Sequence, residues 1–138
     1  MNRTGERDYT PNARTTINKK RPNYITLAIF APLLVLIGIA GFLIPARQSL
    51  TSGAAPYNVF HILFGCIGLL ILWSGKELLA SFFNAGFGLI DLYQAVASYL
   101  DLPPEQYFHW TRVDDIFHIV FGLILTIIGC YGLLRQRS

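Results

Sequence analysis

Apolar residues in this chain gather in long runs that short polar segments separate. The first run, ITLAIFAPLLVLIGIAGFLIP over residues 25–45, holds no charged residue. As an α-helix it is long enough to cross the apolar core of a bilayer, about 30 Å thick. Three further, predominantly apolar runs follow at residues 57–74, 78–100 and 113–134. The pattern predicts an all-α membrane protein with a four-helix transmembrane domain over residues 25–134.

The two ends of the chain are polar and basic. Residues 1–24 hold few apolar side chains that would form a core, so we expect a disordered tail there. Residues 135–138 form a short basic end. The first apolar run exceeds the roughly 7–15 residues of a signal peptide, and no A-x-A cleavage site follows it. We therefore expect the first helix to be retained.

The eleven lysine and arginine residues lie mostly on one side of the predicted bundle. With a cytoplasmic N-terminus, only Arg47 and Arg112 lie outside, in agreement with the excess of positive charge in cytoplasmic segments. We therefore expect both termini in the cytoplasm. No aromatic interleaving accompanies the charge, so we expect no nucleic-acid partner. Basic residues beside a membrane also attract anionic lipid, and we assign this role to Arg14, Lys19, Lys20 and Arg21.

Composition narrows the classes of function. Hydrophobic residues make up 53% of the chain and charged residues only 14%, against about 25% charged in soluble proteins. Soluble enzymes, disulfide scaffolds and disordered regulators are therefore excluded. The sequence contains no G-x-S-x-G, no H-E-x-x-H and no glycine-rich phosphate loop. We expect a protein that is not an enzyme.

Small and polar residues recur along each apolar run at alternating steps of three and four. Such stripes let membrane helices approach closely, because packing rather than hydrophobicity drives their association. We expect a compact bundle in which these stripes face inward. The glycines assigned to helix packing are Gly38, Gly65, Gly68, Gly88, Gly122 and Gly129.

An internal repeat links the second and fourth runs. Residues 58–65 read NVFHILFG and residues 115–122 read DIFHIVFG. Each half of the chain holds two runs, so equivalent helices point the same way. The sequence therefore predicts a duplicated two-helix hairpin, with its pseudo-two-fold axis along the membrane normal.

The two N/D-x-x-H-x-x-x-G segments, together with the G-x-x-D-L-Y segment at residues 88–93, resemble the bacterial four-helix membrane family known as domain of unknown function 4383. The resemblance covers residues from about Ile25 to Leu134. It implies the four-helix architecture and a bacterial inner (plasma) membrane, and a thylakoid-type membrane stays open. The family carries no activity, substrate or catalytic residue to transfer.

His61 and His118 are the strongest candidates for chemistry. Asn58 and Asp115 precede them by three residues, on the same helix face, where a side-chain hydrogen bond would orient each imidazole. Helix spacing predicts ring nitrogens within roughly 12 Å of each other, in the outer half of the membrane. Asp91 is expected deeper, with protein or water beside it, because an ionisable group at the bilayer centre costs at least about 2.5 kcal/mol.

Three interpretations of these polar residues stay open. In the first, His61, His118, Asp91 and Asn84 form a hydrogen-bonded core that sets helix register. In the second, the two histidines bind haem, chlorophyll or a metal such as zinc. In the third, they carry protons or ions across the membrane. Asp114, beside Asp115 at the start of the fourth run, is expected in a solvated acidic rim that the helix dipole favours.

The leading functional hypothesis is a structural or accessory subunit of a membrane assembly, in contact with lipid and with other membrane proteins or further copies of itself. The alternative is a cofactor-binding protein that uses His61 and His118, with electron transfer as one role. On the leading hypothesis no cofactor is expected.

Overall fold

The computed structural model describes residues 21–136, which form five α-helices and one short 3₁₀ helix and contain no strand. In chain order these elements are α1 (Pro22–Leu43), η1 (Ala46–Gln48), α2 (Ala55–Ser74), α3 (Glu77–Leu100), α4 (Glu105–Phe108) and α5 (Arg112–Arg135). Most of the predicted basic tail, including Arg14, Lys19 and Lys20, lies outside the described residues, as do the last two positions of the chain.

By length and composition, α1, α2 and α5 are able to cross a membrane, and the chain is a membrane protein. Their outward faces carry large exposed apolar side chains, among them Leu36, Leu70 and Ile127. Such faces suit lipid rather than water. α3 is also long but is not among these three helices, and its buried face carries polar residues such as Asn84 and Gln94.

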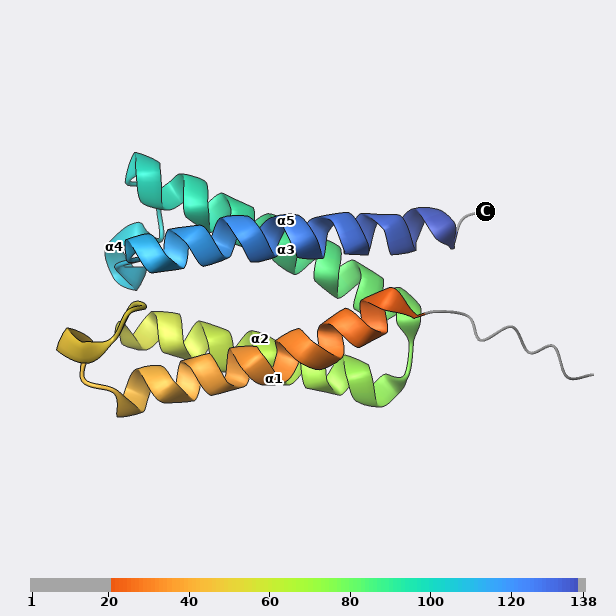
Figure 1. Cartoon of the computed structure of the whole chain (residues 1–138), viewed down its shortest axis with the longest axis horizontal. Helices are drawn as coiled ribbons and strands as arrows, with labels where there is room; N and C mark the ends of the chain where they lie inside the picture. The colour runs from red at the N-terminus through yellow and green to blue at the C-terminus, as the bar shows by residue number, and fades with distance from the viewer. Residues whose placement is uncertain (1–20, 137–138) are drawn as a thin grey trace, which may run out of the picture.

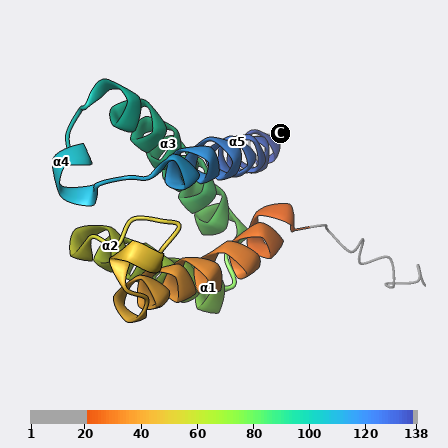
Figure 2. The same cartoon turned by 60° about the vertical axis from the view of Figure 1, so that its left-hand side comes forward.

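The long helices form two pairs (Figure 1). α1 packs along α2, and α3 packs along α5, with much less contact between the pairs. Figure 2 shows the same two pairs from another direction, with η1 and α4 at one end of the molecule. We call this end the loop end. The opposite end, where α1 begins and α5 ends, we call the termini end.

Apolar side chains fill the space between the pairs at mid-length. Leu34 of α1, Phe87 of α3 and Leu125 of α5 are buried together, and Phe60 and Phe64 of α2 pack against them. The rings of Phe64 and Phe87 lie 5.3 Å apart between centroids. All four long helices therefore contribute to one apolar layer.

Helix boundaries differ from the predicted runs at both ends of α1. The helix begins at Pro22, so residues 22–24, which we had assigned to the disordered tail, are helical. It ends at Leu43, because Ile44 is extended ahead of Pro45, as residues before proline usually are. The short elements η1 and α4 were not predicted. Both lie in the loops at the loop end.

The early start of α1 has a tertiary cause. The Glu77 carboxylate, at the first residue of α3, accepts hydrogen bonds from the backbone N–H groups of Asn23 and Tyr24, each at 3.1 Å. Arg21 forms an ion pair with the same carboxylate at 3.7 Å and donates to the carbonyl of Gly75. Glu77 therefore caps a helix that lies more than fifty residues before it in the chain.

We expect Glu77→Ala to lower the free energy of unfolding by about 1–2 kcal/mol, because two amides at the start of α1 lose their acceptor and the helix dipole loses its counter-charge. Unfolding by dodecyl sulfate in mixed micelles measures the loss. Glu105→Ala is the matched control, since Glu105 starts only the short α4. Equal losses in the two variants would contradict the capping role.

Candidate functional site

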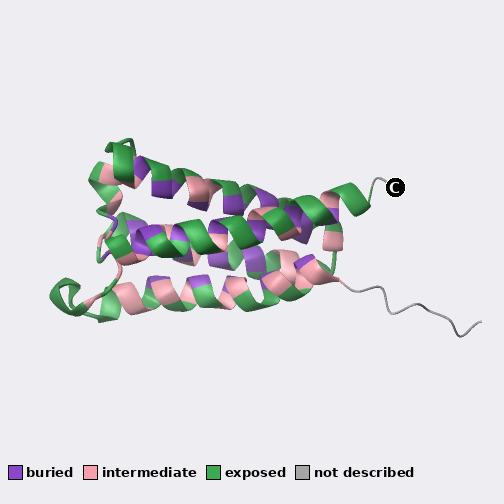
Figure 3. Ribbon diagram, turned by 45° about the horizontal axis from the view of Figure 1, so that its top comes forward, coloured by how far each residue is buried: buried purple, intermediate pink, exposed green. Residues whose placement is uncertain are grey.

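Buried residues lie on the faces that the helices turn toward one another (Figure 3). Toward the loop end, many of these residues are polar. Tyr57, Asn58 and His61 come from α2, Asp91 and Gln94 from α3, and Asp114, Asp115 and His118 from α5. We call these eight residues the polar cluster.

Asp114 lies at the centre of the hydrogen bonding in this cluster. It is fully buried. Its Oδ1 accepts from the hydroxyl of Tyr57 at 2.7 Å. Its Oδ2 accepts from the backbone N–H of Ser52 at 2.8 Å and from the N–H and hydroxyl of Thr111 at 2.8 and 2.9 Å. One carboxylate therefore joins the α1–α2 loop, α2 and the start of α5.

The expectation of a solvated acidic rim is wrong for both aspartates. Asp114 and Asp115 are 0% and 2% exposed. Asp114 is drawn inward because the capping box with Thr111 turns its carboxylate toward the loop that carries Ser52. Asp115 points to the buried side of α5, where Oδ2 meets Arg112 at 3.4 Å. Sequence reasoning therefore missed Asp114, although the Thr111-x-x-Asp114 pattern before an apolar run is a recognisable capping signal.

The structure brings His61 and His118 to one small cavity between the helix pairs. Both side chains are buried, and both line a space of about 30 Å³ together with Asp91. Asp91 packs beside Gly122, one helical turn from His118 toward the termini end. Phe87 and Phe121 belong to the apolar part of the same wall.

The expected hydrogen bonds from Asn58 to His61 and from Asp115 to His118 are not formed. His61 Nδ1 instead pairs with the carbonyl oxygen of Tyr57 at 2.9 Å, one turn back along α2. Helical side chains lean toward the preceding turn, which brings the ring nitrogen to that carbonyl. His118 Nδ1 has no partner among residues 21–136, and its ring lies nearly perpendicular to that of Trp110, with 5.8 Å between the ring centroids.

Asn84 lies apart from the histidines. Its Nδ2 donates to the backbone carbonyl and the side-chain oxygen of Asn23 at 3.1 and 3.0 Å. Asn23 stands in the first turn of α1, so this contact lies toward the termini end. Asn84 therefore bonds across helices, as the polar-core interpretation expects, but in a place that the sequence did not indicate.

The size of the cavity between His61 and His118, and the donor atoms around it, limit what it can bind. A cavity of about 30 Å³ holds one or two water molecules, whereas ligand pockets for larger molecules measure roughly 300–1,000 Å³. A haem or chlorophyll macrocycle does not fit between His61 and His118 in this arrangement. Among residues 21–136, no three His, Cys, Asp or Glu side chains converge as metal ligands.

The packing glycines lie where the stripes predicted them. All six are buried, and a side chain on any of them would approach a neighbouring helix within about 3 Å. The α1–α2 contact uses Gly38, Gly65 and Gly68, and the α3–α5 contact uses Gly88, Gly122 and Gly129. The glycines therefore set the distance within each pair rather than between pairs.

Comparison with known proteins adds no further assignment: the chain matches no family model, no curated protein and no solved structure.

Proposed function

We propose that this protein is a non-enzymatic integral membrane protein that acts as a structural or accessory subunit of a membrane assembly. The observation that carries the proposal is the use of the buried polar side chains. Tyr57 of α2 and Asp114 of α5 join the two helix pairs at the loop end. Glu77 and Asn84 of α3 join the pairs at the termini end, because both bond to the first turn of α1. These groups hold the molecule together instead of surrounding a substrate-sized space.

The proposal includes four membrane spans that arose by duplication of a helical hairpin. A single offset of 57 residues supports it. The first residue of α2, Ala55, lies 57 positions before the first residue of α5, Arg112. The last residue of α1, Leu43, lies 57 positions before the last residue of α3, Leu100.

The glycine contacts between paired helices repeat at the same offset of 57 residues. Gly65 faces Ala31 and Val35 of α1, and Gly122, which is 57 positions later, faces Gly88 and Leu92 of α3, each also 57 positions later. Agreement at these two boundaries and at the glycine contacts favours two copies of one hairpin, although α3 begins two residues earlier and α5 ends four residues later than the offset gives. On this view α3 spans the membrane as α1 does, and its polar residues are accommodated because they face protein.

The proposed orientation places the termini end in the cytoplasm of a bacterium, with the chain in the plasma membrane. Arg21, Lys76 and Arg135 lie at this end of the described residues, while Arg47 and Arg112 lie at the loop end. The distribution agrees with the excess of positive charge in cytoplasmic segments. The choice of a bacterial plasma membrane comes from the sequence resemblance alone and is part of the proposal.

Outward-facing surfaces are where a partner would bind. We expect benzoylphenylalanine placed at Phe42, Phe82 or Phe117 to form, under light in intact membranes, a protein adduct of one reproducible mass from at least one position. These phenylalanines are exposed on α1, α3 and α5. Phe87 is the matched control on α3, because it is 3% exposed where Phe82 is 57% exposed. Adducts are resolved by denaturing electrophoresis and mass spectrometry.

Lipid adducts alone from all three outward positions would contradict the accessory role. Protein adducts of the same mass from the buried position Phe87 would show that crosslinking does not depend on an outward-facing surface. That result would also contradict the accessory role.

A further inference from the structure

The cavity lined by His61, His118 and Asp91 contains polar groups that the hydrogen bonds of the polar cluster do not use. Asp91 is 6% exposed and forms no hydrogen bond or ion pair with any of residues 21–136. His118 is 5% exposed, and its Nδ1 is buried without a partner in the same part of the chain. Burying a polar group without a partner is costly. These two side chains therefore indicate a ligand that the described residues do not supply.

His61 adds a third polar group to the cavity. Its Nδ1 pairs with the carbonyl oxygen of Tyr57, and a carbonyl only accepts, so Nδ1 is the nitrogen that carries the hydrogen. The neutral ring then keeps its lone pair on Nε2. A cavity of about 30 Å³ suits water, and a buried water molecule needs roughly two to four polar partners. Two imidazoles and one carboxyl group meet this requirement.

The charge of the site is smallest when the site holds one proton. With Asp91 ionised and both imidazoles neutral, the cavity would face an isolated carboxylate, which is among the most costly groups to bury. One proton on the Asp91 carboxyl group makes the site neutral and turns this group into a hydrogen-bond donor. Through a water molecule, that donor reaches the lone pair of an imidazole.

The other ionisable groups near the cavity already have partners within the described residues. Tyr57 of α2 donates to Asp114 of α5, and the Asp114 carboxylate accepts four hydrogen bonds in all. Oδ2 of Asp115, also on α5, pairs with Arg112. From α1 the wall receives apolar side chains: Phe30, Leu33, Leu34 and Ile37. The two histidines and Asp91 are therefore the groups left to hold a proton.

The sides of the cavity differ in polarity. Toward the loop end it reaches Thr51, a half-buried residue of the α1–α2 loop that carries a hydroxyl group. Toward the termini end lies the apolar layer at mid-length. Leu33 and Phe117 flank the cavity on the outward-facing surface. The polar route from water to the site therefore starts at the loop end.

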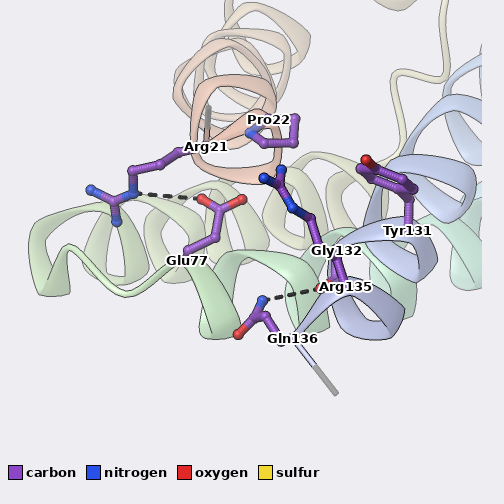
Figure 4. A pocket seen from close by; sticks show the side chains of 7 residues that line it. All are labelled: Arg21, Pro22, Glu77, Tyr131, Gly132, Arg135 and Gln136. Atoms are coloured by element: carbon purple, nitrogen blue, oxygen red, sulfur yellow. Dashed lines mark hydrogen bonds and ion pairs between the residues drawn. The ribbon is translucent and has the colours of Figure 1, made fainter. Parts of the chain in front are cut away.

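The termini end has a separate cavity of about 180 Å³, beside the ion pair of Arg21 and Glu77 (Figure 4). Among the described residues, none lines both cavities. The apolar layer lies between them. The cavity at the termini end therefore gives no route to the histidines.

We propose that Asp91, His61 and His118 form a hydrated proton-binding site that opens to the loop end and is closed toward the termini end. In the binding step a hydronium ion in the cavity transfers a proton to the Asp91 carboxylate, which leaves a neutral carboxyl group and a water molecule. That water links the carboxyl group to an imidazole. The site binds a proton without conducting it across the membrane, because the apolar layer closes the other side. The inference needs only a membrane location and does not depend on the accessory role.

Infrared spectroscopy of the full-length chain in a non-ionic detergent tests for the proton. Near pH 7, where exposed carboxyl groups are ionised, we expect the carbonyl stretching band of a protonated carboxyl group, which shifts in D₂O. Asp91→Asn should lose this band. Asp101→Asn is the matched control and should keep it, because it makes the same change at the exposed C-terminal end of α3. Circular dichroism checks that both variants are folded.

The rate at which this band shifts after transfer to D₂O tests the route. Thr51→Val replaces the hydroxyl on the loop-end side by a methyl group of similar size, so we expect slower exchange. Thr126 follows Leu125 of the apolar layer, on the side toward the termini end, and its hydroxyl is also buried. Thr126→Val is therefore the matched control, and we expect it to exchange at the rate of the wild type.

Absence of a protonated carboxyl band from the wild type near pH 7 would overturn the proposal without recourse to any variant. Persistence of the band in Asp91→Asn, or its loss in Asp101→Asn, would overturn the assignment to Asp91. Exchange in Thr51→Val as fast as in the wild type, or slower exchange in Thr126→Val, would overturn the loop-end route.

Discussion

Replacing Asp114 by alanine is expected to lower the free energy of unfolding by about 3–5 kcal/mol, the largest effect of any single change proposed for this chain. The substitution removes the acceptor for four hydrogen bonds at once. The hydroxyl of Tyr57 and the N–H of Ser52 would then be buried without a partner, and each such group costs about 1–3 kcal/mol. Because these donors come from three segments, the loop end should loosen as a unit.

The neighbouring residue offers a control of the same chemistry. Asp115 is buried almost as deeply, but within residues 21–136 its carboxylate pairs only with the exposed Arg112, at 3.4 Å. We expect Asp115→Ala to cost less than about 1 kcal/mol, since ion pairs with an exposed partner contribute little. The loss in the free energy of unfolding for Tyr57→Phe should lie between the losses for Asp114→Ala and Asp115→Ala, because this variant removes one of the four donors to Asp114. Dodecyl sulfate titration in mixed micelles, followed by circular dichroism, measures all three variants.

Equal losses in Asp114→Ala and Asp115→Ala would contradict the role assigned to Asp114. A loss in Tyr57→Phe as large as that in Asp114→Ala would indicate that the tyrosine contact alone joins the helix pairs.

Gly129→Ala is expected to destabilise the chain by about 2–3 kcal/mol, the cost of forcing a methyl group into a closely packed contact. A Cβ at this position would lie 2.3 Å from the backbone nitrogen of Ala85 and 2.7 Å from its Cα. Backbone atoms cannot rotate away as a side chain does, so α3 and α5 would have to separate. The same titration in mixed micelles measures this loss.

Gly86→Ala is the matched control, on the other helix of the same pair. A Cβ there meets nothing within 4 Å, and alanine favours a helix over glycine by about 0.5–1 kcal/mol. We therefore expect Gly86→Ala to raise the free energy of unfolding and Gly129→Ala to lower it. Destabilisation of the same size in both variants would show that helix propensity, rather than close approach, controls these positions.

Most of the helical architecture was predictable because it depends on local periodicity. The apolar runs predicted α2, α3 and α5 to within a few residues. The three- and four-residue steps predicted which face of each helix would be buried, down to Gly65, Gly122 and His118. A helix turns by a constant angle per residue, so spacing alone determines which side chains share a face.

The hydrogen bonds of the candidate site were not predictable in the same way. Asn58 and Asp115 stand three residues before the histidines, and spacing brings each pair within reach. Spacing alone does not decide which partner each imidazole takes, however, and His61 Nδ1 pairs with the Tyr57 carbonyl oxygen. The Asn23–Asn84 contact joins residues 61 positions apart, for which the sequence carries no local signal.

The sequence by itself determined that this protein is helical, that its helices are apolar enough for a membrane, and which face of each long helix is buried, because hydrophobicity and helical phase are properties of each segment alone. It predicted four spans, whereas three helices of the structure are long and apolar enough to cross a membrane. Only the tertiary structure decided that Asp114 is an internal acceptor and not a solvated acid, and that Glu77 caps α1. These roles depend on the partners that packing brings to each carboxylate. A buried charge persists only where donors from other segments replace the water that it has lost.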